Sequence, residues 1–334
     1  MTGRGDALNW TPDISPIATL PFLRWPGGKR WLPHRLVALL SGLQFRHYYE
    51  PFLGGGAVYF ALQPPQSTLS DINLELINVY RQVRNSATRI EKKLRQFPVD
   101  ASTYAGIRDA APKALIDRAV RFLYLNRTAF AGIYRTNREG RFNVPFGGIE
   151  RRPDTLWTRE LLRDGARALR NAKLLACDFE QQLDAADDGD LVYCDPAYSV
   201  THNDNGFVRY NERVFSWSDQ SRLCAASRRA ATRGATVVVT NADHSELHDL
   251  YRNALAVPIC RVSRLSPTVR YRRLTSECIY MIAPTKVKRV IAATAASVNL
   301  GVSHGVRRLN LERTISRSHT VGWVGEGVAP SDRR

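Results

Sequence analysis

The stretch Asp190-Leu191-Val192-Tyr193-Cys194-Asp195-Pro196-Ala197-Tyr198 decides how this chain is organised. Apolar and β-prone residues run up to Asp195, a proline then stops ladder hydrogen bonding, and an aromatic residue follows. The pattern predicts a buried strand with Asp195 at its C-terminal end, although an ordinary Asp-Pro turn explains this stretch taken alone. Ligands of open α/β sheets bind at the C-terminal ends of strands, so we expect a ligand site here.

The order Asp195-Pro196-x-Tyr198 suits methylation of an exocyclic amine. An adenine amino nitrogen is a poor nucleophile because its lone pair is delocalised into the ring. It needs hydrogen-bond acceptors for its two protons, and the Asp195 carboxylate and the Pro196 carbonyl can supply them. Tyr198 can then stack on a base that has left the duplex. We therefore predict that Asp195, Pro196 and Tyr198 are the catalytic residues.

The overall charge points to a polyanionic partner. The chain of 334 residues carries 48 Lys and Arg against 31 Asp and Glu, a net charge of +17. The excess is spread along the sequence, which indicates a binding surface more than a single charged tail, with simple solubility as the alternative. At this length the chain can bury a full core, and length alone allows two domains.

The spacing of the cysteines and the first residues of the chain indicate the cellular compartment in which the protein works. The five cysteines are widely spaced and none forms a C-x-x-C pair, so neither a zinc site nor a disulfide framework is indicated. The first residues lack the apolar core of a signal peptide, and no apolar run approaches membrane length. We expect reduced thiols, no metal, no membrane contact and a cytoplasmic location.

Two glycine-containing stretches precede the Asp195 strand. Residues 21–29 end in Gly-Gly-Lys, but Arg30 stands where a nucleoside triphosphatase needs Ser or Thr. In residues 50–56 a strand ends near Glu50, and three glycines let the backbone approach a ligand. Tyr59 replaces the third glycine of a dinucleotide fingerprint, which favours a ligand with an adenosine but no phosphate, such as S-adenosylmethionine.

A second strand ends at Asp71, where the acid can accept hydrogen bonds from ribose hydroxyls or cap the next helix. From about Leu74 the pattern becomes helical, with apolar faces over 76–83 and 114–124. This indicates an inserted, largely helical module. It closes with residues 126–147, where arginines alternate with aromatics and glycines; duplex readout and a β-hairpin with a solvated basic face both explain that stretch.

Strands and helices return after the Asp195 strand. Residues 199–216 show no clear periodicity, and Ser218 can cap a helix that stops at Gly234. A buried strand follows over 235–241, and the residues around Cys260 and over 277–282 make two closing strands. The alternation on both sides of the insertion predicts a doubly wound α/β sheet.

Taken together, these motifs resemble the DNA adenine methylase family, amino-methyltransferases that use S-adenosylmethionine. The match runs from about Phe22 to about Ile282. It rests on Phe22–Lys29, Glu50–Gly56, Asp71–Asn73, Leu123–Arg127, Phe142–Gly147 and Asp195–Tyr198. The order of donor-binding segment, glycine loop, target-recognition insertion and catalytic tetrapeptide is that of the family's α group. The resemblance implies a Rossmann-like, S-adenosylmethionine-dependent methyltransferase sheet with an inserted, mainly helical target-recognition domain.

The resemblance also implies the domain plan and the partner. We expect a flexible N-terminus over 1–19, a discontinuous catalytic domain over 20–73 and 156–283, a target-recognition domain over 74–155, and a basic extension over 284–334 that is disordered or a small appendage. The implied partner is double-stranded DNA in a bacterial nucleoid or a phage-infected cell. A monomer is expected, with a dimer on DNA as the alternative.

Site residues carry over from the family by position. The implied donor-binding set is Trp25, Lys29, Glu50, Phe52, Gly54, Gly56, Asp71 and Asp195. The implied DNA-binding set is Phe130, Ile133, Arg135, Asn137 and Arg138. Arg135 stands where relatives read a guanine, Phe130 where an aromatic enters the stack opened by flipping, and Ile133 where an apolar side chain touches bases.

Two positions depart from the family pattern. Ala197 stands where the tetrapeptide usually has a second proline, which predicts a slower or looser enzyme. Ala131 stands where close relatives carry a polar residue, which leaves the recognition sequence open; the resemblance implies a GATC-like target.

The expected mechanism is direct methyl transfer to the adenine amine, without a covalent enzyme intermediate, assisted by alignment and fixed dipoles. A cytosine C5 enzyme would need a nucleophilic cysteine, usually after proline, and no Pro-Cys dipeptide exists here. We interpret Cys194 as core packing. The alternatives are the same chemistry on cytosine N4, an RNA adenine or a protein amide, and a DNA-binding protein that has lost turnover, for which Ala197 is the supporting feature.

Overall fold

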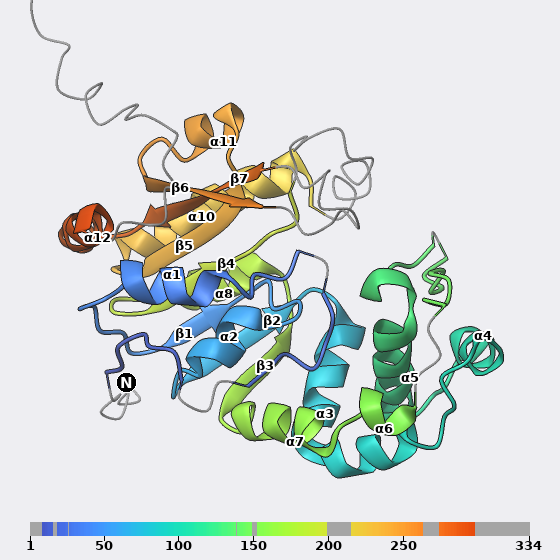
Figure 1. Cartoon of the computed structure of the whole chain (residues 1–334). Helices are drawn as coiled ribbons and strands as arrows, with labels where there is room; N and C mark the ends of the chain where they lie inside the picture. The colour runs from blue at the N-terminus through green and yellow to red at the C-terminus, as the bar shows by residue number, and fades with distance from the viewer. Residues whose placement is uncertain are drawn as a thin grey trace, which may run out of the picture. The chain divides into compact units, whose positions relative to one another are not determined.

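The computed structural model describes residues 9–15, 19–25, 27–137, 139–148, 152–198, 215–262 and 274–297 (Figure 1). Contacts divide the chain into two units, Met1–Leu300 and Gly301–Arg334, and every described residue belongs to the first. Within the described ranges, no helix is long and apolar enough to cross a lipid bilayer.

A seven-stranded sheet with the order β3-β2-β1-β4-β5-β7-β6 carries the fold. The strands from β3 to β5 in this order pair in parallel, whereas β7 pairs antiparallel with both β5 and β6. Their bounds are β1 Tyr48–Glu50, β2 Ser67–Asp71, β3 Ala172–Ala176, β4 Leu191–Cys194, β5 Thr236–Ala242, β6 Leu255–Val262 and β7 Leu274–Ile282. The expected Rossmann-like α/β sheet is confirmed, including the strands predicted at Glu50, Asp71 and Asp195.

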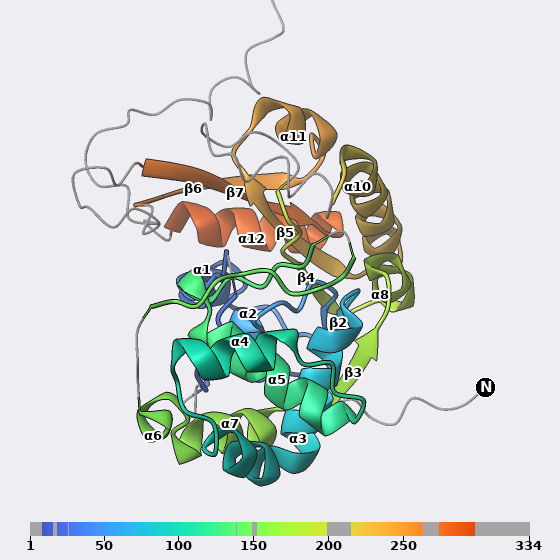
Figure 2. The ribbon, with the colours of Figure 1, turned by 90° about the vertical axis from the view of Figure 1, so that its right-hand side faces the viewer.

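Helices cover both faces of the sheet and enclose two apolar cores. On one face lie α1 Leu32–Leu39, α2 Ala57–Leu62, α3 Leu74–Leu94 and α12 Thr285–Ser297, and on the other α8 Phe179–Ala185, α10 Trp217–Thr232 and α11 Ser245–Leu250 (Figure 2). Successive residues of β4 enter different cores, because side chains alternate along a strand. Tyr193 packs in the first core, and Val192 and Cys194 in the second, which confirms the packing role expected for Cys194.

Between β2 and β3 the chain is mainly helical. The helices after α3 are α4 Ala101–Asp109, α5 Leu115–Thr128, the 3-10 turn Phe130–Gly132, α6 Pro153–Leu156 and α7 Arg159–Ala168. Two antiparallel bridges, Ala129–Phe146 and Thr136–Phe142, fold the segment after α5 back on itself. The long helix α3 contacts β2 and β3 of the sheet as well as α5 and α7. The division at 74 and 155 stays a prediction.

The structure corrects three details of the sequence interpretation. The helix predicted to begin at Ser218 is capped by Ser216, which forms a capping box with Asp219 and so satisfies two backbone donors. Trp10, in the segment expected to be flexible, exchanges two backbone hydrogen bonds of 2.8 Å with Phe45. Most of the loop predicted over 199–216 lies outside the described residues.

The third correction concerns the C-terminal extension. Residues from Thr285 to Ser297 form α12, where a disordered tail or an appendage was expected. The helix contacts α1 and β6, and Ile291 is fully buried there. Burial of this apolar side chain explains why the helix is part of the first unit. Residues 298–334 lie outside the described part of the chain.

Candidate active site

The site lies where the strand order of the sheet reverses. From β1, the chain continues to β2 and then β3 on one side of the sheet. It then crosses to β4, on the other side of β1, and continues to β5. The strand order therefore reverses between β1 and β4, and open α/β sheets bind ligands at such a switch point. Glu50 is the last residue of β1, Asp71 is the last of β2, and Asp195 follows β4 directly. Parallel pairing therefore brings these three predicted site residues to one edge of the sheet.

Lys29 is the central charge of the site. Its Nζ atom lies 3.2 Å from Asp195 Oδ1 and 3.3 Å from Glu277 Oε2, and it donates a hydrogen bond of 2.8 Å to the Tyr198 hydroxyl. The same ammonium lies 4.8 Å from the centre of the Tyr198 ring. Lys29 was expected to contact the donor, and its charged end lies between Asp195 and Tyr198, which were predicted to be catalytic.

Electrostatics keep this lysine charged. Burial alone would lower its pKa, but the Asp195 carboxylate, Tyr198 and the Glu277 carboxylate outweigh burial and raise the pKa above the ordinary lysine value. Lys29 is only 4% exposed and Glu277 only 2%. A buried ammonium is tolerated here because two carboxylates and a hydroxyl surround it.

Asp195 is held through one of its two oxygens. Thr240, on β5, donates a hydrogen bond of 2.8 Å to Oδ1, the same oxygen that faces Lys29. Within the described part of the chain, no residue donates a hydrogen bond to Oδ2, and the side chain is 21% exposed. Burial raises the pKa of Asp195, while Lys29 and the Thr240 hydrogen bond oppose that shift. The carboxylate is thus oriented by Oδ1 and has Oδ2 available.

The rest of the tetrapeptide packs at the sheet edge. Pro196 is buried, and Ala197 and Tyr198 are half-buried against the second core. Burial raises the pKa of Tyr198, so its hydroxyl stays protonated while it accepts from Lys29. The structure therefore brings Asp195, Pro196, Tyr198 and Lys29 together.

Trp25 packs against the glycine loop. Gly54 has a left-handed φ of 46°, and a Cβ atom built there would lie 2.7 Å from Trp25 Cδ1. A Cβ on Gly55 would lie 2.9 Å from Trp25 Cβ. Only glycines allow this approach, so the loop and the indole form one surface.

Asp71 and Glu50 tie the loop to the sheet. Asp71 accepts one backbone hydrogen bond on each oxygen, of 3.1 Å from Gly54 and of 3.0 Å from Asn73. It is Asn73, not Asp71, whose side chain caps α3. Burial raises the pKa of Glu50 to about 8, and the nearby Asp195 carboxylate adds to the shift, against the hydrogen bond of 2.7 Å that Tyr48 donates.

Phe52 lies in an aromatic cluster. Its ring stacks on Phe179 with centroids 5.3 Å apart and meets the edge of Phe215 at 5.5 Å. Gly56, with a φ of 65°, begins α2. Phe52 and Gly56, both predicted to bind the donor, therefore shape the loop that follows β1. Just after β2, the side chain of Ile72 is 74% exposed and presents an apolar surface.

The predicted DNA-binding residues lie on the segment after α5. Phe130 is 57% exposed, and Ile133 is partly buried against the first core. Arg135 is exposed and donates a hydrogen bond of 2.9 Å to Asn143. Asn137 accepts hydrogen bonds from the backbone of Glu139 and Arg141 and so shapes a turn. Arg138 and the side chain of Ala131 lie outside the described residues.

Two contacts join this segment to the predicted donor-binding stretch. The Asn126 side chain, from α5, both accepts from and donates to the backbone of Arg24, at 2.9 and 2.7 Å. The ring of Trp25 stacks on Tyr134 with centroids 6.1 Å apart. The insertion is therefore in direct contact with the residues that flank the glycine loop.

Sequence reasoning missed Glu277 and Thr240. Glu277 lies on β7, opposite Ala242 of β5, which places its carboxylate near the carboxyl ends of the parallel strands. An acid within the otherwise apolar strand 277–282 was the available signal. Thr240 gave no signal, because a threonine in a β-branched run is ordinary.

Comparisons with known proteins identify the family of this chain. The family model of D12 class N6 adenine-specific DNA methyltransferases matches residues 25–267. The chain is 34% identical over 244 residues to the Type II methyltransferase M1.LlaDCHI of Lactococcus lactis subsp. cremoris, covering 70% of this chain and 84% of that protein. It is 30% identical over 245 residues to the DNA adenine methylase of Escherichia coli (strain K12), covering 70% and 84%.

A third relative is the DNA N-6-adenine-methyltransferase of Escherichia phage P1, 32% identical over 237 residues that cover 69% of this chain and 31% of that protein. The family match spans most of the chain and includes Lys29, Asp195 and Thr240, whereas Glu277 lies beyond it. The chain therefore belongs to the D12 class of N6 adenine-specific DNA methyltransferases.

Proposed function

We propose that Asp195 Oδ2 and the Pro196 carbonyl accept hydrogen bonds from the two N–H groups of the N6 amine of a flipped adenine. S-adenosylmethionine would supply the methyl group and leave as S-adenosylhomocysteine, and one amine proton would be released. The observation that carries this proposal is that the contacts of Asp195 with Lys29 and Thr240 both involve the same carboxylate oxygen, Oδ1. Lys29 and Thr240 both contact Oδ1, so the carboxylate is oriented while Oδ2 is available to the base. Positive charge develops on the amine nitrogen during methyl transfer. Hydrogen-bond acceptors that already point at this nitrogen lower the activation barrier, because the site does not have to reorganise.

Lys29 has a positioning role in this proposal. Its positive charge opposes protonation of Asp195, and a protonated acid would be a poorer acceptor for the amine. Its hydrogen bond to the Tyr198 hydroxyl also orients the tyrosine ring. Tyr198 then stacks on the adenine with the ring face that Lys29 does not cover.

The residues at the ends of β1 and β2 fit the donor. S-adenosylmethionine, when bound, supplies an electrophilic methyl on a sulfonium. Trp25 and the glycine loop provide a flat surface that a side chain at Gly54 would fill. The exposed Ile72 offers apolar contact for an adenine ring, beside the Asp71 carboxylate. Asp195 adds negative charge near a positively charged sulfonium, and Glu50 adds a polar carboxyl group.

The segment after α5 is suited to hold duplex DNA. Phe130 presents an exposed apolar ring that can enter an opened base stack. Arg135 is exposed, and its Nε contact with Asn143 orients the guanidinium while its other nitrogens can reach a guanine edge. The contacts of Arg24 and Trp25 with Asn126 and Tyr134 support this placement, because they fix the segment beside the proposed donor site.

The test is transfer of labelled methyl from S-adenosylmethionine to unmethylated duplex DNA. We expect the wild type to label adenine N6, and Asp195→Ala to abolish labelling while target binding persists. Asp188→Ala is the matched control, because this acid also lies near β4 but outside the site. Digestion of the product with methylation-sensitive nucleases identifies the target sequence. Wild-type protein that binds DNA and donor yet transfers nothing would overturn the proposal, as would label on cytosine N4 or on RNA alone.

A further inference from the structure

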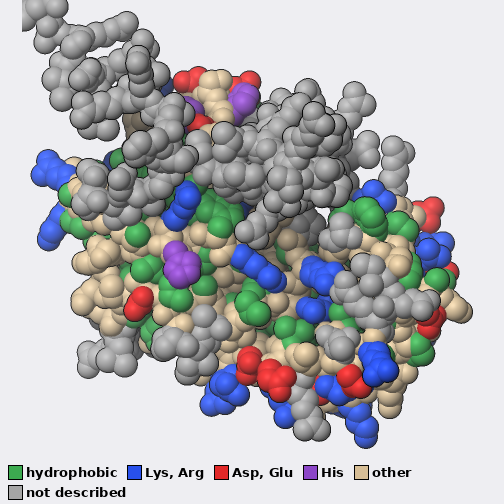
Figure 3. Space-filling model, viewed as in Figure 1, with side chains coloured by type: hydrophobic (Ala, Val, Ile, Leu, Met, Phe, Trp, Pro, Cys, Tyr) green, Lys and Arg blue, Asp and Glu red, His purple; other side chains and the backbone are tan. Residues whose placement is uncertain are grey.

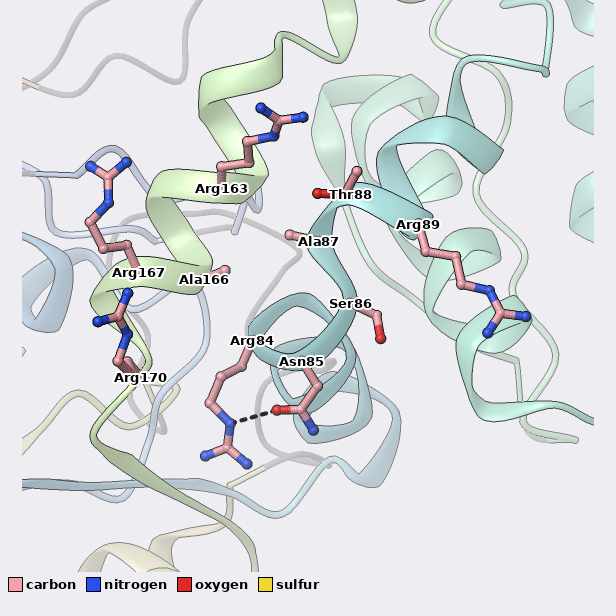
Figure 4. Close-up of a pocket in the computed structure, with 10 residues that line it drawn as sticks. All are labelled: Arg84, Asn85, Ser86, Ala87, Thr88, Arg89, Arg163, Ala166, Arg167 and Arg170. Atoms are coloured by element: carbon pink, nitrogen blue, oxygen red, sulfur yellow. Dashed lines mark hydrogen bonds between the residues drawn. The ribbon is translucent and has the colours of Figure 1, made fainter.

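A second basic surface lies between α3 and α7. The two helices line a cleft of about 770 Å³. Five arginines line it, Arg84 and Arg89 from α3 and Arg163, Arg167 and Arg170 from α7 and the residues after it (Figure 4). Arginine and lysine side chains are also spread over the face of the molecule seen in Figure 3, with acids between them along its lower rim. In the cleft the acids are few.

The charges of the cleft are poorly compensated. Arg163 approaches Glu91 at 3.7 Å and Arg167 approaches Asp164 at 3.4 Å, and Glu91 is shared with Arg95 at 3.1 Å. No described residue forms a hydrogen bond or ion pair with the guanidinium groups of Arg89 and Arg170. Like charges gathered in one cleft repel one another, so an anion bound there is favoured.

Part of the cluster has a structural role. Arg84 donates a hydrogen bond of 2.8 Å to the carbonyl of Ala172 at the start of β3, and Arg81 one of 2.8 Å to that of Leu174. These bonds cover the open edge of β3, where an exposed strand would invite pairing with another chain. Arg89, Arg167 and Arg170 make no such bond, so this role does not explain them.

The lining residues match the chemistry of a phosphodiester backbone. Besides the arginines, the cleft presents the amide of Asn85 and the hydroxyls of Ser86 and Thr88, side chains that commonly contact phosphate oxygens. Ala87 and Ala166 are small and let a bulky chain approach. Among the residues that the structure describes, no aromatic side chain lines the cleft, so these residues offer no surface on which an unpaired base could stack. These features favour the outside of a duplex.

The cleft and the active site lie at opposite ends of the sheet. Helix α3 begins just after Asp71, at the carboxyl end of β2, and runs away from it; Ser86, where the helix departs from helical geometry, lies about 18 Å along its axis at 1.5 Å per residue. The bond from Arg84 to Ala172 places the cleft at the amino end of β3. A straight duplex that delivers a base to Asp195 therefore does not fill it.

We propose that this arginine cleft binds the phosphate backbone of a second segment of double-stranded DNA, apart from the segment that carries the target adenine. The inference rests on DNA being the substrate. A second, sequence-independent contact keeps the enzyme near long DNA between methylation events. It also adds to the salt dependence of binding, because each neutralised phosphate releases counterions.

The test uses the full chain with Arg89→Gln, Arg167→Gln and Arg170→Gln combined. Its control is Arg252→Gln, Lys286→Gln and Arg289→Gln, which removes the same charge from exposed positions near α11 and on α12. Binding and methylation are measured across a salt series on two DNAs with one target each. One is a duplex of roughly one and a half helical turns, the other is several hundred base pairs long.

On the long DNA, we expect the slope of log affinity against log salt to fall by about 2 to 3 in the cleft variant, since each phosphate contact contributes about 0.9. On the short duplex, binding and methylation rate should equal those of the wild type. The control variant should keep the wild-type slope. The single change Arg170→Glu should reproduce the loss in weaker form, which keeps the test available if the triple variant unfolds.

Three results would each overturn the proposal. Unchanged binding of long DNA by the cleft variant would show that the cleft contacts no phosphates. An equal loss of affinity for the short duplex would show that the cleft is part of the target interface. An equal loss of affinity in the control variant would show that the effect comes from net charge alone. Because methylation of the short duplex is read separately, failure here is distinguishable from failure of the proposed function.

Discussion

Lys29 and Asp195, which are 166 positions apart in the chain, form a buried ion pair with 3.2 Å between Nζ and Oδ1. The Glu277 carboxylate also contacts this ammonium, with 3.3 Å between Nζ and Oε2. The Asp195 carboxylate, which is proposed to accept a hydrogen bond from the adenine amine, is thus paired with Lys29, and Lys29 is also paired with Glu277. The ionisation of this cluster can be tested directly.

Replacing Lys29 by methionine removes the charge that opposes protonation of Asp195. Because Lys29 lowers the pKa of Asp195, its loss raises that pKa, and the acid stays protonated to a higher pH. We expect the acidic limb of the pH–rate profile to move to higher pH, and the rate at neutral pH to fall about 100-fold or more. Single-turnover methylation across pH measures both, and Lys286→Met is the exposed control. A variant that is slower with an unmoved acidic limb would contradict the positioning role.

Replacing Glu277 by glutamine should have the opposite effect on pH dependence. The Glu277 carboxylate raises the pKa of Asp195 by like-charge repulsion, so its neutralisation lowers that pKa. The acidic limb then moves to lower pH, with a smaller rate loss than for Lys29→Met. Glu246→Gln, at a side chain that is 63% exposed, is the matched control. An unmoved acidic limb would show that Glu277 supports the site only by packing, and a shift to higher pH would contradict the prediction.

Alanine at Gly54 should weaken donor binding. The added Cβ would lie 2.7 Å from Trp25 Cδ1, and the residue has a φ of 46° that side chains rarely adopt. We expect donor affinity to fall at least about tenfold and stability to fall by about 1–3 kcal/mol, as measured by calorimetry and urea unfolding. Gly106→Ala is the control, because Gly106 lies within α4 and its Cβ would meet nothing within 4 Å. That change should stabilise by about 0.5–1 kcal/mol, and equal effects of the two substitutions would contradict the prediction.

Glu50 makes stability depend on pH between about 4.5 and 8. Its pKa is raised from 4.5 to about 8 in the folded protein, so the folded state binds the proton more tightly than the unfolded state. This contribution to stability is fully present below pH 4.5 and is lost as the pH rises through about 8. Glu50→Gln keeps an acceptor for Tyr48 and carries no charge. We expect it to lose less stability than the wild type between pH 6 and pH 9, by about 2 to 3 kcal/mol, in urea unfolding; equal losses would place the ionisation elsewhere.

Arg135→Ala should relax discrimination at one base pair. Loss of a bidentate contact with guanine costs about 1–3 kcal/mol of specificity, measured as the ratio of kcat/KM on the target and on single-base variants of it. Arg141, 81% exposed and paired only loosely with Glu139 at 3.6 Å, provides the matched alanine control. Uniform weakening on every sequence would instead make Arg135 a phosphate contact.

Local patterns were enough to place the main parts of the site. The apolar run that ends at Asp195 is a strand because buried parallel strands are continuous in hydrophobicity. The shorter strands that end at Glu50 and Asp71 were also predicted, although β2 contains a single apolar residue, Leu69. The glycines of residues 50–56 predicted a close approach, and the structure shows which group approaches, the indole of Trp25. The cap of α10 was missed by two residues, because Ser216 and Ser218 both suit a cap and only the reciprocal bonds with Asp219 select the first.

By itself, the sequence determined the α/β class, the sheet edge that carries Asp195, and the family, because each depends on residues that are neighbours in the chain. Only the tertiary structure decided that Lys29 faces Asp195 and Glu277, that Asn126 binds the backbone of Arg24, and that five arginines share one cleft. The physical reason is that such contacts depend on strand order and helix packing. They join residues about 75 to 250 positions apart, which no local period or spacing relates.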